Sequence, residues 1–404
     1  MNKIFNFTSI LIIFYVIASC GEREFLFESA LNKEAEEILD IDDDKAIELA
    51  KTSLKKNFNN ENNYYSHFII SYAYKNKHNY TESLKHLLKA LSLIPIDAKF
   101  DANRASIHKN IGRIFEKYSE FNMAEEYYQN ALKSVPQEER AGVLLNLGHL
   151  FKESGNLEKS ADFYLDALYL AEQFGQQQRI VVITNQLALV RIRIGEYVSA
   201  RELLYKIIAL KESGKYDKYV GRAFHNIGHS FFEQGLYQKS LINYKQALNY
   251  KKAKSEKFIT LLDIGQTYNK LEMYDSALIH LSTAESIYSA MQQTPENFVV
   301  FKFLQETTIN LGSIDTSQKH LKKFYEAQEN YQITRNQVNN YNNAVKIKKV
   351  IDDYYMQEKV TSQISLLTNT ATLFIIGFII SLLFLIRFIV KRKTGRKILL
   401  EHIR

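Results

Sequence analysis

Turn-forming residues are scarce in this chain of 404 residues, which has only 15 Gly and 3 Pro. So few of them cannot supply the many tight turns of a β-sandwich, a barrel or a propeller. Tryptophan is absent, but 26 Tyr and 25 Phe provide enough large apolar side chains for a sizeable core. That apolar content also excludes disorder of the whole chain. The composition therefore favours an all-α protein.

Cysteine is almost absent too, because Cys20 is the only one in the chain. No intramolecular disulfide can form, even in an oxidising compartment. Cys20 follows one Lys and an apolar run over residues 10–17, a pattern typical of a secretory signal peptide. The residues Ile17-Ala18-Ser19-Cys20 resemble a bacterial lipobox. We expect a lipoprotein-like signal peptide over residues 1–19 and lipidation at Cys20; the alternative is an ordinary cleavage site with an incidental cysteine.

A long apolar run covers residues 366–390, in which Arg387 is the only charge. At 1.5 Å per helical residue, this run is longer than the hydrocarbon core of a bilayer, which is about 30 Å thick. A buried core helix is the alternative, but no polar face interrupts residues 373–380. We therefore expect a transmembrane helix over residues 366–390. The basic tail over residues 391–404 should face the cytoplasm under the positive-inside rule.

The net charge of +7 lies almost wholly at this end of the chain. From Arg387 to Arg404, seven basic residues oppose one acidic residue, which leaves a nearly neutral body. A nucleic-acid site would need its basic residues on the folded body. We therefore expect no nucleic-acid partner.

The middle of the chain repeats. Small residues recur inside the phrase Asn-(Ile/Leu)-Gly or a variant of it, at Ser71, Gly112, Gly148, Ala188, Gly228 and Gly265. A second small residue follows each of them by twelve positions, at Ser83, Ala124, Ser160, Ala200, Ser240 and Ala277. Gln305 and Ser317 keep this offset in a weaker seventh unit. Because the offset is constant while the period varies, each unit should be a rigid helix–turn–helix, with length variation between units. Small residues let the two helices approach closely.

Further positions repeat with these small residues. Glycine occupies the expected turn at Gly155, Gly195, Gly235 and Gly312, and aromatic or aliphatic residues follow at fixed offsets. The whole pattern resembles the tetratricopeptide repeat (TPR) family over residues 64–327, with departures: no Trp at the first large position and periods longer than 34 residues. The resemblance implies an all-α TPR superhelix of helix–turn–helix units. A degenerate helical cap should precede it over residues 24–63, with a half-unit around residues 43–54.

A polar helical stretch over residues 328–365 should connect the array to the span as a helical stalk. Val338, Tyr341 and Val345 have heptad-like spacing, and then the register shifts at Ile351 and Tyr354. Heptads are not sustained over three or four turns. The stalk is therefore either a coiled coil that pairs two copies in a homodimer or a single rigid helix.

The TPR resemblance also implies a ligand site. In that family, one set of first-helix positions faces the concave surface, and here they carry Lys109, Arg113, His149, Asn185, His225, His229 and Gln266. This mixture of cations and amides suits an extended peptide, an acidic one or its C-terminal carboxylate above all. A solvated helix face is the alternative. His225 and His229 are four apart and could share a metal, but no third ligand is evident and we expect none. Asn110, Asn146 and Asn226 should instead form hydrogen bonds within the repeat.

No catalytic signature is present. The sequence has no Gly-rich phosphate loop, no kinase motif, no Gly-x-Ser-x-Gly elbow and no Cys/His cluster. The aromatic residues follow the core spacing of the repeat, so a stacking platform for nucleic acid is not expected. We predict a protein that is not an enzyme and needs no cofactor.

The order of these segments suggests a role at a bacterial envelope. It resembles the extracytoplasmic sensory half of TPR-type membrane regulators, which carry an output domain after the span. About 14 residues follow Val390 here, too few for such a domain. We expect an inner-membrane, single-pass protein with its body in the periplasm, serving as the input part of a signalling system that binds a peptide or protein. The alternative is a structural envelope scaffold without a signalling role.

Overall fold

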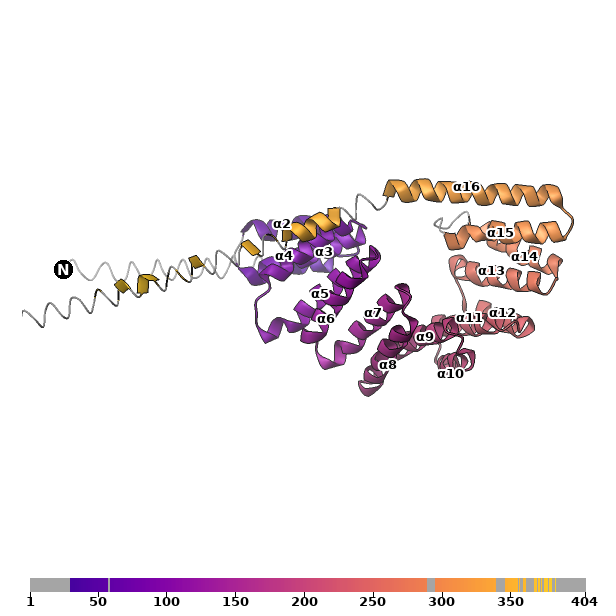
Figure 1. The fold of residues 1–404 in the computed structure, drawn as a ribbon, viewed down its shortest axis with the longest axis horizontal. Helices are drawn as coiled ribbons and strands as arrows, with labels where there is room; N and C mark the ends of the chain where they lie inside the picture. The colour runs from indigo at the N-terminus through magenta and orange to yellow at the C-terminus, as the bar shows by residue number, and fades with distance from the viewer. Residues whose placement is uncertain are drawn as a thin grey trace, which may run out of the picture. The chain divides into compact units, whose positions relative to one another are not determined.

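The computed structural model describes residues 30–56, 59–288, 295–338 and 346–354, with separate positions from 356 to 382. All regular elements among these residues are helices (Figure 1). The chain divides into two units, residues 1–344 and residues 345–404. The predicted signal peptide and Cys20 lie outside the described residues.

The described part of unit 1 begins with a helix over residues 30–37, which is followed by a single helix and then by pairs of helices. We call the members of each pair its first and second helix. The single helix that precedes the pairs is α2 (Asp43–Lys56), which lies at the place of the predicted half-unit. Seven hairpins follow: α3 (Asn60–Asn76) with α4 (Tyr80–Leu93), α5 (Asp101–Lys117) with α6 (Phe121–Ser134), α7 (Arg140–Glu153) with α8 (Leu157–Gln173), α9 (Gln177–Arg193) with α10 (Tyr197–Ile208), α11 (Asp217–Glu233) with α12 (Tyr237–Tyr250), α13 (Lys254–Lys270) with α14 (Tyr274–Tyr288), and α15 (Pro295–Asn310) with α16 (Ile314–Val338).

The hairpins stack in chain order (Figure 1). Each first helix packs against its own second helix, and each second helix packs against the first helix of the next hairpin. Short 3₁₀ helices lie in three of the connections between hairpins, at Ala98–Phe100, Gln137–Glu139 and Lys211–Ser213. The predicted all-α array of repeated hairpins is therefore confirmed, including the expectation that length varies between the units.

The small residues lie where the two helices of a hairpin cross. We call the first of them the small position; it is occupied by Ser71, Gly112, Gly148, Ala188, Gly228, Gly265 and Gln305. A Cβ atom on Gly112, Gly148 or Gly228 would come within 2.5–2.8 Å of the nearest ring carbons of a tyrosine that follows by sixteen residues. These three tyrosines, Tyr128, Tyr164 and Tyr244, are among the largest fully buried side chains of the protein. The absence of a side chain at the small position is what lets each ring fit between the helices.

The second small residue adds a hydrogen bond at the same crossing. Ser160 Oγ donates to the carbonyl oxygen of Gly148 at 2.7 Å. Ser317 Oγ donates to the carbonyl oxygen of Gln305 at 3.2 Å in the last hairpin. Both pairs are twelve residues apart, so this bond contributes to the constant offset in those units.

The turn inside each hairpin has one residue in the left-handed backbone region. It is the seventh residue after the small position in all seven hairpins, and φ there lies between 57° and 87°. Glycine, which adopts this conformation without strain, occupies it in four hairpins, as expected. The other three have His78, Ser119 and Glu272. Asparagine caps α4 and α8, where Asn79 Oδ1 and Asn156 Oδ1 accept from the backbone N–H three residues later.

The last helix joins the array to the region predicted as a stalk. α16 runs without a break from Ile314 to Val338, so the predicted boundary between residues 327 and 328 falls inside one helix. Residues 339–345, which include Tyr341 and Val345, lie outside the described residues, and homodimerisation through the stalk stays a prediction. In unit 2, residues 346–354 are helical.

The predicted span over residues 366–390 is described only at separate positions. Over the part of the chain that the structure describes, no helix combines the length and the apolar character needed to cross a bilayer. The transmembrane helix therefore stays a prediction, as does the basic tail, which lies outside the described residues.

Two glycines of α7 provide a direct test of the crossing. A Cβ on Gly148 would meet Tyr164 at 2.5 Å, whereas a Cβ on Gly142 would meet only Arg179, at 3.7 Å. We expect Gly148→Ala to lower the free energy of unfolding by about 1–3 kcal/mol through overpacking. Gly142→Ala should raise it by about 0.5–1 kcal/mol, because alanine favours a helix. Urea titration followed by circular dichroism measures both free energies of unfolding. Equal effects of the two changes would contradict the close packing of Tyr164 on Gly148.

Candidate functional site

The first helices of the N-terminal hairpins line a groove. Its volume is about 1000 Å³, and its walls come from α3 to α9. Three amides lie two residues before the small position in successive hairpins: Asn110, Asn146 and Gln186. Other lining residues lie one, four or five residues after it, at Lys75, Asn76, Arg113, Glu116, Lys117, His149 and Glu153. This spacing puts them along one face of each helix.

Two of the seven predicted site residues, Arg113 and His149, line this groove. Lys109 lies one turn before Arg113 and is half-buried. Burial and the nearby cations of Arg113 and Arg179 lower its pKa, whereas Glu139 raises it. Asn185 is buried and accepts a hydrogen bond from Asn226 Nδ2 at 2.9 Å. That bond joins the first helices of two neighbouring hairpins, so Asn226 bonds between repeats and not within one as expected, and it uses the side-chain oxygen of Asn185.

The other three predicted residues, His225, His229 and Gln266, lie on α11 and α13, outside the groove lining. Asn110 and Asn146 had been expected to form hydrogen bonds within the repeat. Asn110 Nδ2 does donate to the carbonyl oxygen of Ser106 at 2.9 Å, but both asparagines also line the groove. The groove therefore brings together a set of first-helix residues that differs from the predicted set.

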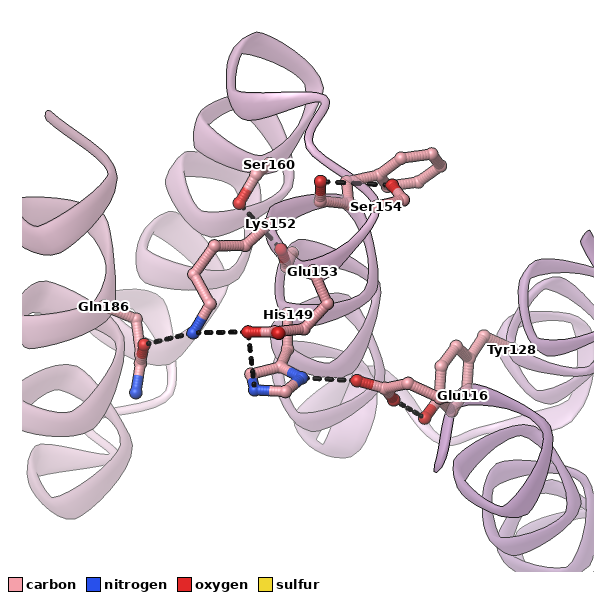
Figure 2. A network of polar contacts seen from close by, with 10 residues as sticks. Glu116, Tyr128, His149, Lys152, Glu153, Ser154, Ser160 and Gln186 are labelled. Carbon is pink, nitrogen blue, oxygen red and sulfur yellow. Dashed lines mark hydrogen bonds and ion pairs between the residues drawn. The ribbon is translucent and has the colours of Figure 1, made fainter. Parts of the chain in front are cut away.

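A chain of polar contacts links three successive hairpins beside the groove (Figure 2). Tyr128 Oη donates to Glu116 Oε2 at 2.6 Å. The other carboxylate oxygen, Glu116 Oε1, bonds His149 Nδ1 on the next first helix. His149 Nε2 then lies 3.7 Å from Glu153 Oε1, which is 3.3 Å from Lys152 Nζ. Lys152 Nζ reaches Gln186 Oε1 at 3.4 Å, on the third first helix.

The groove has an uneven charge balance. Both of its glutamates are engaged within the chain, Glu116 by Tyr128 and His149, and Glu153 by contacts with His149 and Lys152. Lys75 Nζ lies over the ring of Tyr72, 3.3 Å from its centroid, and Lys117 Nζ lies over Tyr80 at 4.7 Å. These lysines rest on aromatic rings, and neither is paired with a carboxylate among the residues that the structure describes, so the groove offers positive charge.

Comparison with known proteins agrees with this geometry. The tetratricopeptide repeat family model matches residues 64–97, 141–174 and 221–254, which cover the first, third and fifth hairpins. The chain contains tetratricopeptide repeats. A comparison with curated proteins found no match.

Solved structures of similar TPR-like arrangement include the apo form of RapI, with a TM-score of 0.58 and 15% sequence identity, covering 83% of this chain and 99% of RapI. A Rap protein complexed with competence and sporulation factor has a TM-score of 0.49 and 15% identity, covering 82% of this chain and 99% of that one. A tetratricopeptide repeat protein from Parabacteroides merdae ATCC 43184 has a TM-score of 0.49 and 16% identity, with coverages of 72% and 98%. At such identity, the likeness to RapI supports the fold alone.

A second polar cluster joins the fifth and sixth TPR hairpins. His225 Nδ1 lies 3.1 Å from Thr260 Oγ1, and His225 Nε2 lies 3.4 Å from Asp263 Oδ2. Lys251 Nζ donates to the same Thr260 hydroxyl. Both ring nitrogens of His225 therefore have partners on α13. Within the described residues, no group of three His, Cys, Asp or Glu side chains is placed to hold a metal ion.

Burial governs the titration of this cluster. It lowers the pKa of His225 well below its usual value and also lowers that of His229. An unperturbed imidazole begins to charge below about pH 6.5, where it could attract an acidic ligand. Burial opposes that charging at both His225 and His229, because desolvation disfavours the charged ring.

Sequence reasoning missed the carboxylates of the site. Glu116, Glu153 and Asp263 lie on the same first helices as the predicted donors, and they engage His149 and His225. Glu116 and Glu153 lie four and five residues after the small position, one helical turn beyond residues that we had selected. Helical spacing could have placed these two glutamates on the groove face. It could not have shown which helix each one contacts.

Asp263 should make stability depend on pH. Burial raises its pKa to about 7, and Lys251 opposes that rise. Between about pH 4 and pH 7 the folded carboxyl holds a proton that the unfolded one has released, so its contribution to the free energy of unfolding falls as pH rises through this window. We expect Asp263→Asn to remove this loss. Its stability relative to the wild type should therefore grow from pH 5 to pH 7, by on the order of a few kcal/mol.

The measurement is urea unfolding of both proteins at several pH values. The quantity to follow is the difference between the two proteins in free energy of unfolding. Buried histidines such as His225 are present in both proteins and stabilise the fold as pH rises, so their effect is subtracted out. A difference that stays constant from pH 5 to pH 7 would show that Asp263 titrates normally.

Proposed function

We propose that this chain is a protein-interaction module whose TPR array holds a peptide, or an extended segment of a partner protein, in the groove between α3 and α9. The observation that carries this proposal is the charge balance of that groove. Its carboxylates are engaged internally, while Arg113, Lys75 and Lys117 face it without a carboxylate partner among the described residues. An acidic ligand would supply the missing charge.

The amides of the groove suit an extended backbone. Asn110, Asn146 and Gln186 come from three successive first helices, so stacking spaces them along the groove. Each amide side chain carries both a donor and an acceptor, which is what a peptide unit requires. Nothing in this arrangement calls for catalysis or for a cofactor, and we propose neither.

We expect replacement of Lys109 and Arg113 together by Ala to weaken ligand binding while leaving the fold intact. Each charge-assisted contact is worth about 1.5–3 kcal/mol when partly desolvated. A matched control is Lys85 and Lys89, which are also four residues apart but are exposed on the second helix α4. The partner would be recovered from envelope extract and its affinity measured by titration. Full affinity in the Lys109/Arg113 variant would move the site to the convex face or the stalk.

We further propose that the module is anchored at the bacterial inner membrane with its body in the periplasm. The support comes from the sequence: the lipobox-like Cys20, the apolar run over residues 366–390 and the basic tail over residues 391–404. An acyl chain together with a membrane span would make detachment negligible. In this arrangement the TPR array would be the input part of a signalling system.

Cysteine accessibility in whole cells tests that topology. An impermeant thiol reagent should label Ser154→Cys, which lies at an exposed turn, and should leave Lys393→Cys unlabelled. After permeabilisation both variants should react, which serves as the control. Labelling of Lys393→Cys alone in intact cells would reverse the proposed orientation.

A further inference from the structure

The last hairpin exposes a position that is covered in the other six. The residue that follows the small position by sixteen is at most 1% exposed in each of the first six hairpins, where it is Leu87, Tyr128, Tyr164, Leu204, Tyr244 or Leu281. In the seventh hairpin this residue is Leu321, and its exposed fraction is 38%.

Two neighbouring positions change in the same way. Ile314 and Tyr325, nine and twenty residues after Gln305, are 66% and 60% exposed. The residues at the same two places in the first six hairpins are all half-buried. Ile314, Leu321 and Tyr325 therefore lose their cover together.

The earlier hairpins show what kind of element provides that cover. Each earlier second helix packs against the first helix of the next hairpin, as α14 packs against α15. Among the described residues, α16 is the last helix of unit 1, and no further first helix follows it there. The exposed side of α16 is therefore a stacking surface of the repeat, and its shape fits another helix.

The composition of this side is that of an interface. Residues spaced by three, four or seven positions share one side of a helix. We call this side the α16 stripe; its members are exposed and uncharged, and they are Ile314, Gln318, Leu321, Tyr325, Gln328 and Gln332. Depletion of charge is typical of the centre of a protein interface. Each glutamine offers both a donor and an acceptor to a partner.

The charges beside the stripe indicate which helix it fits. Lys322 and Glu329 are seven residues apart, so they lie on the same flank, about one turn before and one turn after Tyr325. Lys322 is 77% exposed, and its contact with Glu326 of the same helix is 3.7 Å, longer than a hydrogen bond. A two-fold axis near Tyr325 would bring Lys322 of each copy opposite Glu329 of the other. The surface is thus complementary to itself in the antiparallel orientation.

We propose that the α16 stripe binds the α16 stripe of a second copy of this chain, with the two helices antiparallel. Each α16 would then cover the other, as the first helix of the next hairpin covers a second helix elsewhere in the array. This contact is separate from the groove and from the predicted coiled coil over residues 328–365, because its apolar members lie before residue 328.

Site-specific disulfide formation in the full-length chain tests this pairing. Cys20→Ser is included in every variant, so that an introduced cysteine is the only one. Tyr325→Cys lies near the proposed axis, and Lys319→Cys is the matched control, exposed on the same helix but outside the stripe. Membranes of expressing cells are oxidised with copper phenanthroline and analysed on a non-reducing gel. We expect a disulfide-linked dimer from Tyr325→Cys and little from Lys319→Cys, because the bond requires Cα atoms within about 7 Å.

Two further changes are made in the Tyr325→Cys chain. Leu321→Glu should lower the yield of dimer about tenfold, since it places a charge in an apolar contact, and should leave the melting temperature unchanged. Glu329→Lys should also lower the yield, because it brings two lysines together. Adding Lys322→Glu to Glu329→Lys should restore the yield, because both pairs are then reversed.

Three outcomes would overturn the proposal. The first is the absence of a dimer from Tyr325→Cys, whether its thiol reacts freely with a maleimide or is protected by a later segment of the chain or by another protein. The second is an equal yield from Lys319→Cys, which would indicate random collision. The third is a reversed charge pair that restores nothing, which would exclude the antiparallel contact.

Discussion

The close approach of a glycine or another small residue to a large buried side chain is the constraint on which this architecture depends. At Gly112, Gly148 and Gly228 the space of a Cβ atom is taken by a tyrosine ring from the facing helix. The ring follows sixteen residues later because the end of one helix, the turn and the first half of the next helix lie between them, as from Gly112 to Tyr128. Every other regular feature of the hairpin follows from holding this crossing fixed, including the left-handed turn residue seven positions after the small residue.

The crossing also explains where the repeats differ. The differences in repeat length lie outside the crossing. One source is the 3₁₀ segments such as Ala98–Phe100, and another is helix length, since α8 has 17 residues where α6 has 14. The residue four positions after the small one also differs between hairpins. Glu116 accepts a hydrogen bond from the buried Tyr128 hydroxyl, whereas the corresponding Lys152 carries only donors. The hairpins therefore share one crossing but differ in the polar contacts around it.

The sequence predicts the hairpins well because both partners of each crossing lie within one unit. The twelve-residue offset from Gly148 to Ser160, confirmed by the hydrogen bond between them, requires no knowledge of how units stack. The contacts between hairpins are harder to foresee, because they join residues 33 to 41 positions apart, such as Glu116 with His149 and Asn185 with Asn226. Which helix faces pair at that range depends on the rotation between units, and a single sequence does not reveal it. Donors were therefore predicted, but not the carboxylates that engage some of them.

The two polar links between hairpins differ in a way that bears on binding. The link through His149 and Glu153 is half-exposed and includes contacts of 3.3 and 3.7 Å, so its side chains can exchange one partner for another at small cost. The link through His225, Thr260 and Asp263 is largely buried, and separating its members would leave uncompensated polar groups in a medium that penalises them. A ligand entering the proposed groove would therefore rearrange side chains most easily between α5 and α9, and would disturb the α11–α13 junction least. The array thus combines a buried polar junction between its fifth and sixth hairpins with a more exposed polar network between its second and fourth hairpins.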